Sequence, residues 1–190
     1  MSAVRSCFPE GCSLSTAAVM VVRSQLIAVD TNVLMDLADD REDVWDAIET
    51  IRNRVKGAVF VATSTVIQEL AYAADEGDTP EKRDLAAIAL TKLDSEWGFK
   101  SANFVPVGHG ITEITANKIR SAGLLPEEEV NDSLIIAEAA LGNCTILLSS
   151  DAHISGIDQT ALSLVLGSCD INKVLLASPA KIVRDFFQKQ

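Results

Sequence analysis

Short, uninterrupted apolar runs separated by amphipathic segments are the feature that most constrains how this chain folds. The clearest runs are residues 26–29, 58–62, 145–148 and 174–176, and a further short strand is expected at 103–107. Strands buried on both faces of a parallel sheet read as continuous apolar runs, whereas half-exposed strands alternate. Helical periodicity begins at residues 31 and 63, and it extends over 43–56, 81–93, 111–122, 126–141 and 179–188. This alternation predicts an α/β fold with a parallel sheet covered by helices on both faces.

The length of the chain predicts one domain. Its 190 residues, of which 48% are hydrophobic, are enough for one core and too few for two ordinary domains. No apolar run approaches the roughly 20 residues of a membrane span. We expect a globular domain over residues 26–190, preceded by a loosely ordered extension over 1–25. An alternative is that translation starts at Met20 and that the stretch before it is a mis-assigned start.

The charge of the chain opposes unassisted binding to nucleic acid. Lysine and arginine number 16 against 27 aspartate and glutamate residues, which gives a formal net charge of −11. Such a charge repels phosphate backbones and anionic membranes. Any nucleic-acid function must therefore account for the acidity.

The cysteines and histidines do not form a recognisable metal or redox motif. The four cysteines contain no C-x-x-C pair and have no histidine nearby; they are Cys7, Cys12, Cys144 and Cys169. The two histidines, His109 and His153, are far apart in the sequence, which argues against an imidazole-built metal site. We expect reduced thiols in a cytoplasmic protein.

Four acidic residues are expected at the carboxyl edge of the predicted sheet. Asp30 follows the first strand directly, and Asp151 follows the strand at 145–148. Glu69 lies one helical turn beyond the strand at 58–62, and Asp132 lies near the start of the helix predicted at 126–141. In open α/β sheets, ligands bind outside the carboxyl ends of the strands. The four side chains therefore fall where a site would be.

Each acid also has an ordinary structural alternative. Asp30 could cap the following helix, and Asp151 could begin a turn. Glu69 is not needed as a capping-box residue, because Thr65 and Gln68 already have the T-x-x-Q spacing. Taken together, however, four converging acids repel one another, and a divalent cation makes such a cluster tolerable. Oxygen ligands without paired histidines favour Mg²⁺ or Mn²⁺ over zinc, and these ions promote phosphodiester hydrolysis.

Four segments resemble, in order, the four motifs of PIN-domain ribonucleases. They are residues 29–37 (VDTNVLMDL), 65–69 (TVIQE), 131–137 (NDSLIIA) and 148–151 (LSSD). The resemblance spans almost the whole chain from Leu26 onward. It implies a three-layer α/β/α sandwich with a central parallel sheet, and it implies cleavage of single-stranded RNA with bound Mg²⁺ or Mn²⁺.

The resemblance also implies roles for individual residues. The metal site and the catalytic site would consist of Asp30, Glu69, Asp132 and Asp151. Hydrogen bonds that orient these carboxylates would come from Thr31 or Asn32 and from Ser149. Many compact members resemble VapC-type toxins that pair with an antitoxin; this chain departs from them in its N-terminal extension and its longer 75–125 region. An antitoxin or another protein partner and a homodimer are both compatible with the resemblance.

The substrate contacts and the rival functions remain open at this stage. No lysine or arginine occurs between residues 121 and 172, so RNA phosphates would have to be bound from elsewhere; the candidates are Arg52, Arg54, Lys56, Lys118 and Arg120, with ordinary solvated charges as the alternative. Asp36, Asp158 and His153 lie near the predicted edge and are expected to have surface roles. The rival functions are a catalytically silent PIN-like scaffold and another Mg²⁺-dependent phosphohydrolase. The latter typically has D-x-D where this chain has D-T-N.

Overall fold

A five-stranded parallel sheet forms the centre of the computed structural model, which describes residues 24–102 and 106–187. The strand order is β3-β2-β1-β4-β5. The strands are β1 (Gln25–Val29), β2 (Ala58–Ala62), β3 (Lys100–Ser101), β4 (Ile146–Leu148) and β5 (Leu175–Ala177). The first strand of the chain therefore lies in the middle of the sheet, and Ile27 is aligned with Phe60 on one side and Ile146 on the other.

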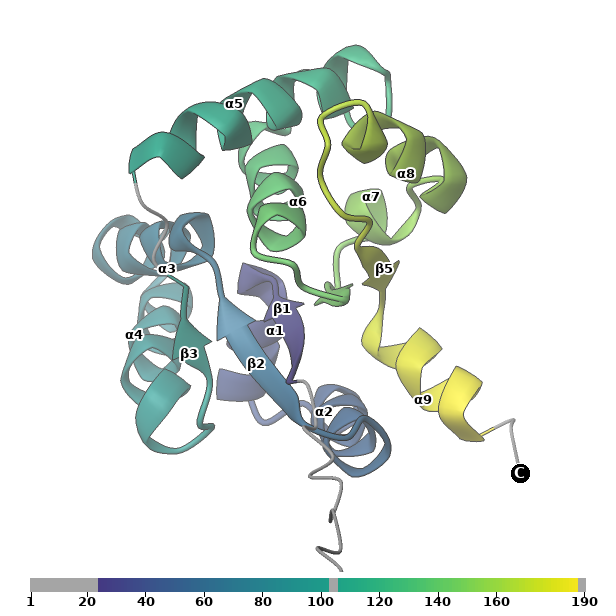
Figure 1. Ribbon diagram of the computed structural model, residues 1–190. Coiled ribbons are helices and arrows are strands. Elements are labelled where there is room, and N and C mark those ends of the chain that lie inside the picture. Colours follow the sequence, from purple (N-terminus) through teal and green to yellow (C-terminus); the bar gives the residue numbers. More distant parts are fainter. Residues whose placement is uncertain (1–23, 103–105, 188–190) are drawn as a thin grey trace, which may run out of the picture.

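Helices flank the sheet on both faces and complete the predicted three-layer α/β/α fold (Figure 1). The helices are α1 (Thr31–Ala38), α2 (Glu42–Arg54), α3 (Ser64–Glu76), α4 (Pro80–Ser95), α5 (Pro106–Ser121), α6 (Val130–Leu141), α7 (Ala152–Ser155), α8 (Gln159–Gly167) and α9 (Pro179–Phe187). Helix α3 packs on α4 and α6, α2 packs on α9, and α5 packs on α6 and α8. None of the helices in the described ranges is long and apolar enough to cross a membrane.

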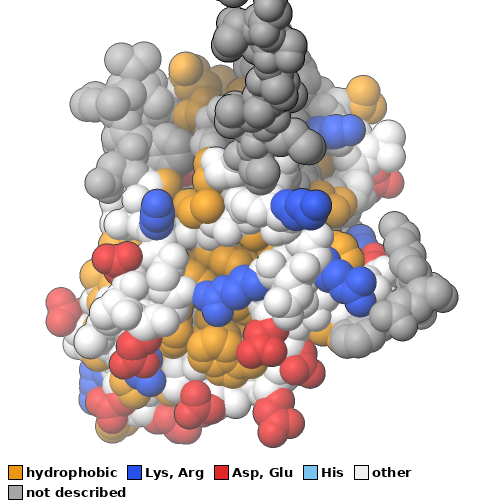
Figure 2. Space-filling model, turned by 60° about the horizontal axis from the view of Figure 1, so that its bottom comes forward, with side chains coloured by type: hydrophobic (Ala, Val, Ile, Leu, Met, Phe, Trp, Pro, Cys, Tyr) orange, Lys and Arg blue, Asp and Glu red, His pale blue; other side chains and the backbone are white. Residues whose placement is uncertain are grey.

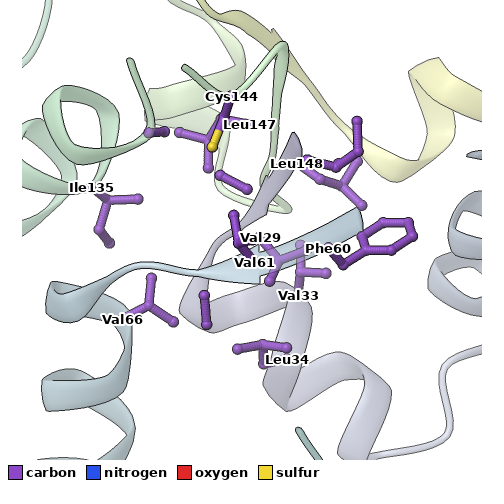
Figure 3. Close-up of a cluster of buried hydrophobic side chains, with 14 of the residues drawn as sticks. Val29, Val33, Leu34, Phe60, Val61, Val66, Ile135, Cys144, Leu147 and Leu148 are labelled. Carbon is purple, nitrogen blue, oxygen red and sulfur yellow. The ribbon is translucent and has the colours of Figure 1, made fainter. Parts of the chain in front are cut away.

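The core is built from the strands and from the inner faces of the helices next to them. Val29, Phe60 and Leu148 extend from adjacent strands, and Val66 and Ile135 meet them from α3 and α6 (Figure 3). Residues 27–29 have no solvent-exposed surface, which explains why this strand reads as an unbroken apolar run. The packing of the sheet interior thus also fixes the position of Asp30, the residue that follows β1.

The surface charge is unevenly distributed. On the face shown in Figure 2, acidic side chains gather along the lower border, while lysine and arginine side chains lie across the middle. The two cysteines in the described ranges are free thiols: Cys144 is buried and Cys169 is partly exposed. Cys7 and Cys12 lie outside the described residues, as does most of the predicted 1–25 extension, so that boundary remains a prediction.

Several predicted element boundaries were wrong. A strand was expected at 103–107, but residues 103–105 lie outside the described residues and Pro106 begins α5, as suits a residue whose φ is fixed for a helix start; the short strand β3 lies earlier, at Lys100–Ser101. The helix expected from Pro126 begins only at Val130, because residues 126–129 form a turn in which the Glu129 N–H donates to the Pro126 carbonyl at 3.1 Å. Helices α7 and α8 were not predicted.

The start of α3 also differs from the predicted capping box. Thr63 is the N-cap residue and makes no side-chain capping bond. The Thr65 N–H instead donates to Oε2 of Glu138 at 3.0 Å, and Glu138 is a buried residue of α6. Since the first N–H groups of a helix have no partner within it, this contact from a different helix replaces the local cap. It also ties α3 to α6.

Replacing Glu138 tests how much the hydrogen bond between α3 and α6 contributes to the stability of the protein. Glu138→Leu keeps most of the volume but removes the acceptor, so the Thr65 N–H is left buried without a partner, which should lower the free energy of unfolding by about 1–3 kcal/mol. Glu138→Gln keeps an acceptor oxygen and should lose less. Urea denaturation of both variants measures the difference. Equal stability of the two would contradict the proposed cap.

Candidate functional site

Asp30 is a buried carboxylate at the carboxyl end of the central strand. Its side chain belongs to a residue that is only 2% exposed. Oδ1 accepts the Thr31 N–H at 2.7 Å, which caps α1, and Oδ2 accepts the Ser149 hydroxyl at 2.7 Å from the end of β4. Burial raises the pKa of Asp30 to about 7, although both hydrogen bonds favour the ionised form. Asp30 therefore caps α1, but this role does not explain its second hydrogen bond, to Ser149 after β4.

Glu69 and Asp132 approach Asp30 from two helices. The Thr31 hydroxyl donates to Oε2 of Glu69, so Thr31 contacts both Asp30 and Glu69. The charges of Asp132 and Glu69 add to the rise in the pKa of Asp30. Asp132 is half-buried, and its own pKa is raised to about 6, first by burial and then by the charges of neighbouring acids that include Glu129, Asp151 and Glu69. The structure thus brings three predicted acids together.

Asp151 is linked to the other acids through Ser149 and through its effect on Asp132. The Ser149 hydroxyl, which donates to Asp30, accepts the Asp151 N–H at 3.0 Å. Oδ1 of Asp151 accepts the His153 N–H at 2.6 Å and so caps the short helix α7. The Asp151 charge nevertheless contributes to the raised pKa of Asp132. Ser149 therefore lies between two of the four acids, as the predicted orienting role requires.

The donor set suits a hard divalent cation, although the side chains as placed do not converge on one point. The four acids offer carboxylate oxygens only, which is the chemistry that Mg²⁺ and Mn²⁺ prefer. Mutual repulsion within a partly buried cluster is relieved when a cation is bound. Within the described ranges, no group of three or more His, Cys, Asp or Glu side chains is arranged to hold an ion. Coordination would thus require the carboxylates to turn toward one another.

Two hollows at this edge of the sheet share Asn32. One, of ≈ 270 Å³, is lined by Asp30, Glu69 and Asp132 together with Tyr72 and Lys82, among others. The other, of ≈ 420 Å³, is lined by Asp151, Asp36 and Arg41, among others. A larger hollow of ≈ 590 Å³ beside β5 has no acidic residue in its lining. The four carboxylates therefore line two adjoining hollows, which we together call the trough, rather than one closed pocket.

The predicted phosphate-binding residues are not gathered at this trough. Arg52 donates to the Trp97 carbonyl at 2.6 Å and lies over the rings of Phe60 and Phe99, where it packs α2 against the sheet. Arg54 and Lys56 precede β2 and so lie toward the opposite edge of the sheet.

The two remaining basic candidates lie on α5. Lys118 reaches the Ser168 carbonyl at 3.3 Å, beyond the end of α8. Arg120 donates to the Ser133 hydroxyl and to the Asn117 side chain. Ser133 is next to Asp132 in the sequence, but Arg120 lines neither of the two hollows that the acids line.

The minor candidates near the edge have local roles. Asp36 accepts the Ser150 hydroxyl at 2.7 Å and pairs with Arg41 at 3.7 Å. Asp158 caps α8 by accepting two backbone N–H groups at 2.8 Å. His153 lies 3.3 Å from Glu129.

Among the residues that line the trough, sequence reasoning did not single out Tyr72 or Lys82. Tyr72 stands three residues after Glu69, so helical spacing alone would have placed both on one face. Lys82 belongs to α4 and reaches the trough only because α4 packs on α3. Nothing in the sequence around Lys82 signals that position.

Comparison with known proteins identifies a family and solved structures of similar fold. A family model described as PIN domain matches residues 27–159. The chain is also similar to a chain in the crystal structure of VapBC2 from Rickettsia felis bound to a DNA fragment from their promoter, with a TM-score of 0.56 and 15% sequence identity. That likeness covers 81% of this chain and 98% of the other, and at such low identity it concerns the fold alone. None of the curated proteins matches this sequence.

The raised pKa of Asp30 predicts a stability change that depends on pH. The folded-state pKa of about 7 lies above the ordinary value of 3.8, so the folded protein binds more protons between these values and its free energy of unfolding falls as pH rises through them. At pH 8 in EDTA, Asp30→Asn removes the buried charge and should stabilise the protein by about 1–4 kcal/mol. Near pH 4 the difference should vanish.

Urea denaturation at both pH values measures this effect. Asp94→Asn, at an exposed position on α4, is the matched control and should change stability little at either pH. A destabilised Asp30→Asn protein at pH 8 would show that the hydrogen bonds to the carboxylate outweigh its burial.

Proposed function

We propose that this chain, which belongs to the PIN-domain family, is a ribonuclease that hydrolyses single-stranded RNA internally with the help of Mg²⁺ or Mn²⁺. The family match confirms the resemblance read from the four sequence motifs. The observation that carries the proposal is the position of Asp30, a buried carboxylate with its pKa raised by desolvation and by the charges of Asp132 and Glu69. Such an arrangement is unfavourable in itself and suits a group that binds a cation.

Asp30, Glu69, Asp132 and Asp151 would hold the cation. When bound, it activates water as a nucleophile and stabilises negative charge on the phosphodiester. Ser149 and Thr31 would orient the carboxylates, since each donates a hydroxyl proton to one of them. The open trough suits a polymer that passes across the site rather than a small enclosed substrate.

A basic protein partner would complement the negative net charge of the molecule. The structural likeness to a chain of VapBC2 makes an antitoxin-like partner a reasonable proposal, and a net charge of −11 suits a basic one. A homodimer is proposed from the family resemblance, and a cytoplasmic location from the cysteines, which form no recognisable disulfide or metal motif. A silent scaffold is less favoured, because all four acids are present. Another Mg²⁺-dependent phosphohydrolase is less favoured because residues 30–32 lack a second acid.

Neutralising one ligand should abolish cleavage. Asp30→Asn and Asp132→Asn keep the shape of the side chain but remove a charge needed for the cation, so Mn²⁺-dependent cleavage of single-stranded RNA should fall by at least about 100-fold. Cleavage is measured on a denaturing gel with and without EDTA, and circular dichroism checks the fold. Asp94→Asn is the control and should cleave normally. Full activity in both site variants would refute the assignment.

Cation binding should strengthen as the pH rises. Asp30 and Asp132, with pKa values of about 7 and about 6, are partly protonated at pH 6, so a cation must displace protons there. At pH 8 both are ionised, and the Mn²⁺ affinity should be about tenfold higher or more. Isothermal titration calorimetry in two buffers of different ionisation enthalpy measures both affinity and proton release. Equal affinity at both pH values would contradict a site that includes Asp30.

A further inference from the structure

Tyr72 is an aromatic side chain left in solvent beside the acidic cluster. It is 70% exposed and lies on α3, one turn beyond Glu69. Other aromatic residues of the described chain pack on one another: Trp45 lies 6.3 Å from Trp97 in an edge-on arrangement, and Phe60 stacks on Phe99 at 4.8 Å. Tyr72 lines the same hollow as Asp30 and Glu69. An exposed ring is thus available next to the site.

Lys82, a basic residue in the first turn of α4, lines the same hollow. Its backbone is fixed in the first turn of α4, where its N–H donates to the Thr79 hydroxyl at 3.2 Å. Its ammonium group lies 3.8 Å from a carboxylate oxygen of Asp78, whose side chain is 90% exposed. Exposed ion pairs of this kind contribute little to stability, so the contact with Asp78 holds the ammonium group only weakly. The Lys82 charge can therefore engage a phosphate that enters the hollow.

We propose that Tyr72 and Lys82 form a nucleotide-binding subsite beside the carboxylate cluster, in which Tyr72 stacks on a base of single-stranded RNA and Lys82 contacts a phosphate. The inference rests on the proposed ribonuclease function and deepens it. Proteins bind single strands by combining aromatic rings, on which bases stack, with cations that follow the backbone. Both elements occur here, on two helices that pack together.

The charge of the cluster explains why such a subsite is needed. Four acids repel the phosphates of the substrate, and the bound cation offsets this only at its own position. A ring interacts with a base without involving the phosphate charge, and Lys82 neutralises one neighbouring phosphate. Because every base has a flat face, the subsite is tolerant of base identity and favours unpaired nucleotides over duplex.

Direct binding measurements separate the two contributions. The probe is a fluorescein-labelled, mixed-sequence RNA of about 12 nucleotides, followed by anisotropy in Ca²⁺ and checked for integrity on a denaturing gel. Tyr72→Ala should weaken binding about tenfold or more, whereas Tyr72→Phe should bind like the wild type. Lys82→Gln should lower the slope of log Kd against log salt by about 0.7, the value for one phosphate contact on a single strand.

Matched controls come from residues away from the trough. Leu164→Ala removes a side chain that is 72% exposed on α8, and Lys173→Gln removes an exposed charge next to β5. Neither should change the affinity or the salt slope. As a readout that does not depend on affinity, RNA carrying 5-iodouridine should crosslink to the peptide containing Tyr72 on irradiation, and mass spectrometry identifies the site.

The outcomes distinguish this inference from the function on which it rests. If the wild type cleaves RNA and Asp30→Asn does not, but Tyr72→Ala binds as tightly as Leu164→Ala, the subsite is refuted while the ribonuclease function stands. If the wild type neither binds nor cleaves the RNA, both fail. A crosslink at Tyr72 together with weaker binding of Tyr72→Ala supports the subsite.

Discussion

The structure depends on a carboxylate held where the sheet interior meets its edge. Asp30 follows three residues of β1 that have no exposed surface, so its position is fixed by the packing of the central strand. The hydroxyl of Ser149 and the backbone of Thr31 hold its two oxygens. Because burial and neighbouring charges act against the ionised form, the fold keeps this group at a site where its charge is unfavourable. Buried carboxylates with strongly raised pKa values occur most often at functional sites.

The helices complete the site by bringing distant groups to the same edge. Helix α6 supplies Asp132 and also supplies Glu138, which caps α3, the helix that carries Glu69. A hydrogen bond between α3 and α6 therefore holds together the two helices that carry Glu69 and Asp132, against the repulsion between these two acids. Helix α4 then packs on α3 and adds Lys82 to the hollow that Asp30, Glu69 and Asp132 line.

Sequence patterns predicted the sheet and the acids because both follow from local rules. A buried parallel strand reads as an apolar run, and an acid directly after such a strand falls at the carboxyl edge. The contacts made by packing could not be read in this way. Glu138 sits within an apolar helix and meets a residue 73 positions away, and Arg52 looked like a solvated charge until Phe60 and Phe99 were placed beneath it. The turn at 126–129 was missed because Pro126 and three glutamates also suit a helix start.

The position of β1 in the middle of the sheet has a consequence for the timing of assembly. Asp30 and Ser149 are 119 positions apart in the chain, and β4, which ends just before Ser149, pairs directly with β1. A ribosome releases β1 long before it has made β4, so during synthesis Asp30 lacks its hydroxyl donor and Asp151 does not yet exist. The cluster can form only when most of the chain has emerged. The cation site proposed above therefore cannot be complete before Asp151 has been made.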